Sequence, residues 1–179
     1  MNKYIFLSLA IVFSVILVSC KEDSKDAPSV YDGAKDANHN YNYFPIPYIV
    51  FETSVSSFNY YMLNHEYSVV DTTEVDTEGG KLTYLRGLHK AAGDNEKDVS
   101  YLATFVNEKY ALLEVFLKYD EATLNAVNTD FEARYDKKDD GAYLTIDGKV
   151  KIVVEKKEAA NTLFSDETQE YVVVTYSLP

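Results

Sequence analysis

The sequence predicts an α+β fold in which an antiparallel sheet carries two helices on one face. Two kinds of pattern predict it. Apolar side chains recur every three or four residues over residues 54–67 and 120–135, which is the period of an amphipathic helix. Elsewhere apolar and polar side chains alternate, and turn signals at residues 107–109 and 147–148 join the alternating segments into antiparallel hairpins.

The first elements follow a segment rich in aromatic residues, Tyr41 to Tyr48. Two prolines in this segment favour extended backbone and exclude a helix. We expect Ile49 to Phe51 to form a short first strand. A helix over residues 54–67 follows, with Thr53 or Ser54 as its N-cap. Its apolar face comprises Val55, Phe58, Tyr61, Met62 and His65.

Residues 69–80 contain several acidic side chains and no Lys or Arg, which predicts a solvated connector. A strand over residues 81–88 and a polar loop over residues 91–98 follow. The clearest strand signal is a hairpin of residues 101–106 and 110–119. Its second strand should direct Ala111, Leu113, Val115, Leu117 and Tyr119 to the core, with Glu114 and Lys118 in water.

The second helix covers residues 120–135, and Asp120 should be its N-cap. Asp120 and Glu121 also complement the positive end of the helix dipole. Residues 136–141 form a turn that ends the helix. The apolar spacing of the helix depends on Leu124, Val127, Phe131 and Tyr135.

A second hairpin is predicted from residues 143–146 and 149–155, because Asp147-Gly148 is typical of a type I′ turn. Val150, Ile152 and Val154 should face inward from it. Residues 156–169 are predicted to form a loop or a helix. Residues 170–178 alternate again and are predicted to be the closing strand.

The order of elements indicates an internal α-β-β-β duplication, since the helix positions Val55, Phe58, Tyr61 and His65 lie 66 residues before Glu121, Leu124, Val127 and Phe131. This alternation resembles the small α+β modules of envelope lipoproteins and of the β-lactamase inhibitor proteins. The resemblance implies that helices cover one face of an antiparallel sheet. The resemblance is one of pattern only, so no functional residue of those families can be assigned to a position in this sequence.

Residues 1–19 have the pattern of a secretory signal, with a positive charge at Lys3 and an apolar run from Tyr4 to Val18. As a helix this run would reach about 22 Å, short of the roughly 30 Å hydrocarbon core of a bilayer. It ends in Leu17-Val18-Ser19-Cys20, which resembles the lipobox of bacterial lipoproteins. The resemblance implies cleavage before Cys20 and acylation, for example with palmitate. An uncleaved anchor or an ordinary signal peptide is the alternative.

Cys20 is the only cysteine, so the chain cannot form an internal disulfide. Lys21-Glu22-Asp23 resembles the export signal that sends lipoproteins of one Gram-negative phylum to the cell surface. We therefore expect an outer-membrane, lipid-anchored protein whose domain faces either the cell surface or the periplasm. Residues 20–44 are predicted to be an acylated cysteine and a disordered acidic stalk, and residues 45–179 a single globular domain.

Charge narrows the choice of partners. The chain has 17 basic and 29 acidic side chains and a formal net charge of −12, which argues against nucleic acid and anionic lipid head groups. Attachment to the membrane would then depend on the acyl chains. The 16 tyrosines can either fill a core or offer rings to a ligand. We expect a monomer.

No catalytic motif is present. The chain lacks a nucleophile elbow, a P-loop and a dinucleotide fingerprint, so no catalytic residue and no cofactor is predicted. The three histidines, His39, His65 and His89, fall in the stalk, the first helix and a loop, which argues against a shared metal site.

Two weaker candidates remain. Asp136, Asp140 and Asp147 match positions 1, 5 and 12 of a calcium-binding loop, but Lys138 occupies position 3, so a turn is the better interpretation than a metal site. Thr72, in Asp71-Thr72-Thr73, lies in a triplet that resembles the short acceptor for O-linked glycans in the same phylum.

These features predict a non-enzymatic, lipid-anchored envelope protein that binds a protein or a glycan. The binding surface would be the exposed sheet face or the aromatic segment that precedes the first strand. Two other classes stay open: a hydrolase with paired carboxylates from distant strands, and an inhibitor or immunity-type module. A pocket that holds two carboxyl groups about 5 to 10 Å apart, one with a raised pKa, would favour the hydrolase.

Overall fold

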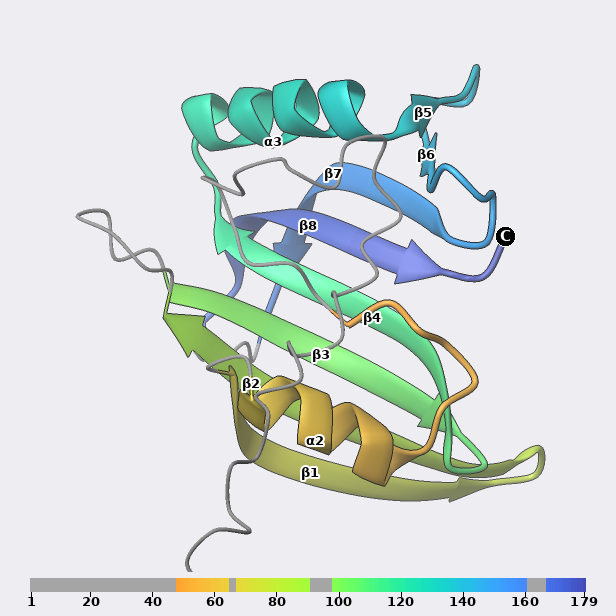
Figure 1. Ribbon diagram of the computed structural model, residues 1–179. Helices are drawn as coiled ribbons and strands as arrows, with labels where there is room; N and C mark the ends of the chain where they lie inside the picture. Colours follow the sequence, from red (N-terminus) through yellow and green to blue (C-terminus); the bar gives the residue numbers. More distant parts are fainter. Residues whose placement is uncertain (1–47, 65–66, 91–97, 161–166) are drawn as a thin grey trace, which may run out of the picture. The chain divides into compact units, whose positions relative to one another are not determined.

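A computed structural model describes residues 48–64, 67–90, 98–160 and 167–179. These residues form a predominantly β structure with two helices, and the eight described strands lie in one antiparallel sheet (Figure 1). The predicted α+β class with an antiparallel sheet and two helices is confirmed. In chain order the elements are α2 (Val55–Asn64), β1 (Tyr67–Thr77), β2 (Gly80–Lys90), β3 (Asp98–Val106), β4 (Lys109–Lys118), α3 (Glu121–Arg134), β5 (Asp136–Lys137), β6 (Tyr143–Leu144), β7 (Lys151–Ala159) and β8 (Gln169–Ser177).

The strand order across the sheet is β1-β2-β3-β4-β8-β7-β6-β5. The two halves of the chain therefore meet at the pair formed by β4 and β8, where Val115 lies opposite Val174. Because paired residues point to the same side of a sheet, the register defines two faces. The inner face carries Tyr101, Leu113, Val115, Ile152 and Val174. The outer face carries Leu102, Leu112, Glu114, Phe116 and Val173.

Helix α2 begins where the sequence predicts, because the Ser54 hydroxyl accepts a hydrogen bond from Ser57 N at 3.2 Å. Phe58 and Met62 are fully buried, one helical turn apart. The predicted helix extends too far, since α2 ends at Asn64 and Tyr67 already belongs to β1. The Phe58 ring packs against three rings of the sheet, those of Tyr101, Phe105 and Tyr110.

The predicted strand at Ile49 to Phe51 is wrong. This segment meets β4 only at the start of that strand, where pairing with β8 has not yet begun, and it makes a single bridge there, from Ser54 to Lys109, which is too short for a strand. It turns instead at Glu52, whose φ is 63°, and Glu52 N donates to Tyr110 O at 2.9 Å. Ile49 and Phe51 are nevertheless buried, so the segment is fixed to the core by its side chains.

The predicted acidic connector is also wrong, because these residues form strand β1, paired with β2 from Tyr67 opposite His89 to Thr77 opposite Gly80. Valine and threonine make up much of β1, and β-branched side chains favour extended backbone. The acidic side chains between them stay in water at the edge of the sheet. Strand β2 agrees with the prediction for residues 81–88.

The hairpin of β3 and β4 is confirmed. Its turn residues Asn107 and Glu108 both have positive φ, 50° and 65°, which is the type I′ conformation. The first of them is held by β2, since Asn107 N donates to Lys81 O at 2.8 Å and Lys81 N donates to Asn107 Oδ1 at 2.9 Å. This contact ties the tips of two neighbouring hairpins together.

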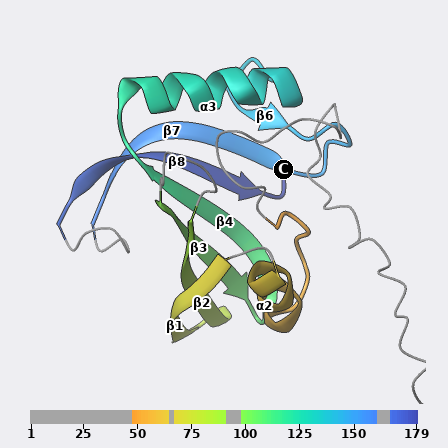
Figure 2. The ribbon, with the colours of Figure 1, turned by 60° about the vertical axis from the view of Figure 1, so that its left-hand side comes forward.

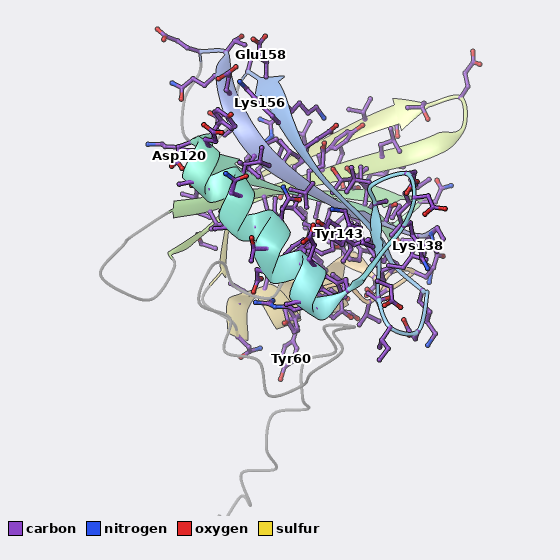
Figure 3. All side chains as sticks on the ribbon, turned by 90° about the horizontal axis from the view of Figure 1, so that it is seen from above. Tyr60, Asp120, Lys138, Tyr143, Lys156 and Glu158 are labelled. Carbon is purple, nitrogen blue, oxygen red and sulfur yellow. The ribbon has the colours of Figure 1, made fainter. Side chains whose placement is uncertain are left out.

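Helix α3 is confirmed with its predicted cap. The Asp120 carboxylate accepts hydrogen bonds from Thr123 N at 2.6 Å and from Thr123 Oγ1 at 2.9 Å. Val127 and Phe131 are buried, and α3 lies next to β7 (Figure 2). Figure 3 shows Asp120 at the start of the helix and Tyr143 near its other end, where the Tyr143 ring contacts that of Phe131.

The second hairpin differs from its prediction in turn type. Of Asp147 and Gly148 only Gly148 has a positive φ, 69°, whereas a type I′ turn requires two such residues. Gly148 N donates to Thr145 O at 2.8 Å, so the turn is centred one residue earlier. The Asp147 carboxylate accepts from Thr145 Oγ1 at 2.8 Å and from Lys149 N at 3.1 Å, which stabilises this geometry.

Three further segments complete the comparison. Val150 and Ile152 are buried as predicted, and β8 is the predicted closing strand. The turn predicted for residues 136–141 begins with the short strand β5. Strand β7 continues to Ala159, into the segment predicted to be a loop or a helix, because it stays paired with β8 over that length.

Candidate functional site

Several predicted site residues lie outside the described residues. These are the lipid-attachment residue Cys20, the export residues Lys21, Glu22 and Asp23, and the boundaries predicted at residues 19 and 44. His39 and His65 lie outside them as well. Neither helix in the described part of the chain is both long and apolar enough to cross a membrane.

The three aspartates of the calcium candidate are distributed over β5 and two turns. Lys151 Nζ lies 3.1 Å from Asp140 Oδ2, and Lys149 Nζ lies 3.1 Å from Asp147 Oδ2. Each of these two carboxylates is therefore paired with an ammonium group from its own region. Among the residues described, no three His, Cys, Asp or Glu side chains gather in a group that could hold a metal ion.

A depression of about 490 Å³ lies beside these turns, and its lining includes Lys138, Asp139, Asp140 and Lys151. The hydrogen bond from Lys151 lowers the pKa of the Asp140 carboxyl, and a second one from the Ala142 amide acts in the same direction. A catalytic acid needs the opposite shift, because it must hold its proton near neutral pH. Asp140 is therefore not poised as a catalytic acid.

A second depression, of about 320 Å³, is apolar apart from Lys149. It lies where the segment before α2 meets the end of β8, and Val50 and Leu178 are its most exposed apolar members. With a single polar side chain in its lining, it offers an apolar contact and little that could orient a small molecule.

Most described tyrosines belong to the core. Tyr101, Tyr110, Tyr143, Tyr171 and Tyr176 are each less than 2% exposed. Two of these hydroxyls bond within the core, since Tyr110 OH donates to Tyr48 O at 2.8 Å and Tyr143 OH donates to Asn128 Oδ1 at 3.1 Å. Burial raises the pKa of Tyr101 and of Tyr143. The abundance of tyrosine in this part of the chain therefore reflects packing.

The outer face of the sheet is a further candidate surface. Phe116, Tyr171 and Val173 form a buried apolar cluster there, against which Leu102 and Ala159 pack. In the described structure this cluster is built from strand residues alone, without a side chain from α2 or α3. Around it the half-exposed apolar side chains of the outer face are Leu82, Tyr84, Leu88, Leu102, Leu112 and Val153.

Charges on the outer face occur as neighbouring opposites. Lys157 Nζ lies 3.0 Å from Glu114 Oε1, and Arg86 lies 3.9 Å from Asp71. Each acidic side chain of these two pairs is balanced by a neighbouring basic one, although the formal net charge of the whole chain is −12. The outer face therefore combines partly exposed apolar side chains with nearly balanced charge.

Thr72 lies in the middle of β1 and is exposed, as are its neighbours Asp71 and Thr73. The Thr73 hydroxyl is directed to Asp71, with Oγ1 at 3.4 Å from Oδ2. An enzyme that modifies this triplet would therefore meet an ordered strand.

The sequence prediction missed the outer face as an apolar surface. It assigned the face of β4 opposite Leu113 to water because of Glu114 and Lys118. Leu112 and Phe116 alternate with these charged residues on that same face, and Leu102 lies directly across from Glu114 on β3. The available signal was the alternation of apolar and polar residues in both β3 and β4. It identifies a shared apolar face only once the register of the two strands is known.

No family model matches the chain, and neither the curated proteins nor the solved structures contain a significant match to it. The class that the geometry defines is an α+β protein whose described strands form one eight-stranded antiparallel sheet. One face of that sheet has an apolar cluster of strand residues, and no described helix adds to it.

Proposed function

We propose that this protein is a non-enzymatic, lipid-anchored protein of the bacterial cell envelope whose domain binds a partner protein through the outer face of its sheet. The observation that carries the proposal is the set of half-exposed aliphatic side chains around Phe116 and Val173 on that face. Contiguous apolar surface of this kind is typical of interaction sites on soluble domains.

A protein is a better fit than a glycan. Sugar rings bind to exposed aromatic faces flanked by hydrogen-bonding groups, but the half-exposed side chains around the cluster are mainly Leu and Val, with one ring, Tyr84. Protein interfaces have an apolar centre with a polar rim. The pair of Glu114 and Lys157 beside the cluster would supply part of such a rim.

The anchor rests on the sequence. Leu17-Val18-Ser19-Cys20 supports cleavage and acylation at Cys20, and Lys21-Glu22-Asp23 supports display at the cell surface. Because each buried methylene contributes about 0.8 kcal/mol, two or three acyl chains would hold the domain firmly at the outer membrane. A binding domain on a stalk would then meet its partner close to the lipid surface.

We also propose that both helices lie on the inner face and that the two halves arose by duplication, with one described helix and four described strands in each half in place of the predicted α-β-β-β unit. Each helix precedes four strands, and the strand order matches β1 with β5, β2 with β6, β3 with β7 and β4 with β8 about the central pair. Phe58 and Met62 of α2 belong to the same core cluster as Val127 and Phe131 of α3, and both pairs are four residues apart.

Fragments cut between β4 and α3 should therefore reassociate into a native sheet. Fragments that stay unfolded after mixing would argue against two such units.

The outer-face proposal is tested by site-specific photo-crosslinking in intact cells. A photoreactive amino acid at Leu102 or Leu112 should yield a discrete adduct with a partner protein, identified by mass spectrometry. The same probe at Tyr60, which is 75% exposed on α2, is the matched control and should yield none. Absence of an adduct at both leucines, an equal adduct at Tyr60, or an adduct with a glycan mass would each overturn the proposal.

A further inference from the structure

Strand β1 forms an open edge of the sheet. Within the described structure it pairs with β2 alone, and every residue from Val70 to Gly79 is exposed. The opposite edge is β5, which has only two residues. Strand β7 pairs with β6 only at Lys151 and Ile152, so a shorter stretch of β7 is also open among the described residues. The β1 edge is the longer of the two, and beyond a bulge at Val70 its pairing with β2 is regular from Asp71 to Thr77.

An edge of this kind can accept another strand. In an antiparallel pair, alternate residues direct their backbone N–H and C=O groups away from the neighbouring strand. Along β1 these groups face the side opposite β2, where an added strand would pair with them. The β-branched residues Thr72, Thr73 and Val75 keep the backbone extended, so little ordering would be needed on binding.

The charge of β1 disfavours pairing with a second copy of itself. Residues 67–80 carry Asp71, Glu74, Asp76 and Glu78 and no basic side chain. Two β1 strands side by side would bring these carboxylates close together, and like charges opposite one another destabilise a sheet. The same charges would attract a basic strand.

The register places two of these acids on one side of the sheet. Glu74 is paired with Thr83 and Asp76 with Lys81, so both project on the side of the inner face. Glu74 also forms an ion pair with Lys81 at 2.6 Å, in which both side chains are more than a third exposed. Exposed pairs of this kind are weak, so Glu74 can exchange this partner for another at little cost.

We infer that the β1 edge binds an extended segment of a partner protein by strand addition, and that this segment carries Lys or Arg at alternating positions. The basic side chains lie opposite Glu74 and Asp76, and the backbone of the segment continues the sheet beyond β1. This edge is a separate surface from the outer face, and the inference does not depend on the proposed function.

The test uses a synthetic peptide that alternates lysine and valine over the length of Asp71 to Thr77. Addition of this peptide to the ¹⁵N-labelled domain should shift the amide resonances of β1 and slow their hydrogen exchange. A peptide with glutamate in place of lysine should bind at least several-fold more weakly. In the domain, Glu74→Lys combined with Asp76→Lys should weaken binding of the lysine peptide by roughly 3- to 10-fold, as expected for two exposed charge pairs.

Two controls isolate the edge. Asp139→Lys combined with Glu158→Lys changes the net charge equally at exposed positions outside β1 and should leave peptide binding unchanged. Leu102→Lys, which alters the outer face, should also leave peptide binding unchanged. The inference about the β1 edge and the proposal about the outer face can therefore be refuted independently. Equal binding of the acidic peptide, shifts confined to other strands, no binding at millimolar peptide, or self-association of the domain through β1 would each overturn the inference.

Discussion

The ring of Tyr101 lies over Gly87, its cross-strand neighbour on β2. A Cβ atom at residue 87 would overlap the end of that ring and the carbonyl oxygen of Ser68 on β1. Tyr101 is buried, and its hydroxyl donates to Ser68 O at 3.4 Å. Glycine at residue 87 therefore lets a side chain from β3 cross β2 and contact β1, which supports the open edge of the sheet from its inner side.

Gly87→Ala should destabilise the domain by roughly 1–3 kcal/mol, because the added methyl group must displace a buried ring or the β1 backbone. Urea unfolding followed by circular dichroism measures this change. Gly79→Ala, in the turn that joins β1 and β2, is the matched control, since the added Cβ would lie 3.8 Å from Thr77 Oγ1, and it should change stability by less than about 0.5 kcal/mol. Equal stability of the two variants would show that the ring contact is unimportant.

Asp120→Ala should cost about 1 kcal/mol of stability, because the variant leaves the first amides of α3 without the carboxylate that accepts from Thr123 N. Asp120→Asn keeps an acceptor oxygen at the same place and should retain most of the stability. Chemical unfolding of the three proteins gives both differences. If asparagine destabilises as much as alanine, the charge of Asp120 matters and its capping hydrogen bond does not.

The sequence correctly predicted those helices and strands whose identifying pattern lies within a few neighbouring residues. The Asp120 cap and the spacing from Val127 to Phe131 identified α3, and alternation identified β4. Strand β1 was missed because its acidic residues indicate solvent, and a strand at the edge of a sheet can be exposed on both sides. The prediction for Ile49 to Phe51 was wrong for the converse reason, since apolar side chains can also fix to the core a segment that is not a strand.

The candidate surfaces depended on register, which the sequence does not specify directly. Leu102 and Leu112 become neighbours of Glu114 only through pairing of β3 with β4. The position of β1 at the edge depends on the β4–β8 pair, which joins residues far apart in the sequence. A local pattern contains neither fact, because long-range pairing is decided by the packing of the whole sheet.

Lys151→Ala should raise the pKa of Asp140 toward its ordinary value, since the Lys151 hydrogen bond is the main cause of the lowered pKa. A carboxyl with a lowered pKa in the folded state stabilises the fold when ionised. That contribution is present above the ordinary pKa and is lost as pH falls through the lowered value. Carbon NMR titration of the Asp140 carboxyl measures the shift. Lys149→Ala is the control and should leave it unchanged; a shift of equal size in that variant would contradict the assigned pair.

Cys20→Ala should abolish lipid attachment, because the proposed anchor depends on the only thiol in the chain. Cells grown with labelled palmitate should label the wild-type protein and not the variant, and the variant should move from the detergent phase to the aqueous phase in a detergent partition. Replacement of Lys21, Glu22 and Asp23 by alanine should preserve labelling and reduce accessibility to protease on intact cells, since those residues are proposed to direct display and not acylation. A Cys20→Ala protein that still takes up palmitate, or a wild-type protein whose mass includes residues 1–19, would refute the anchor.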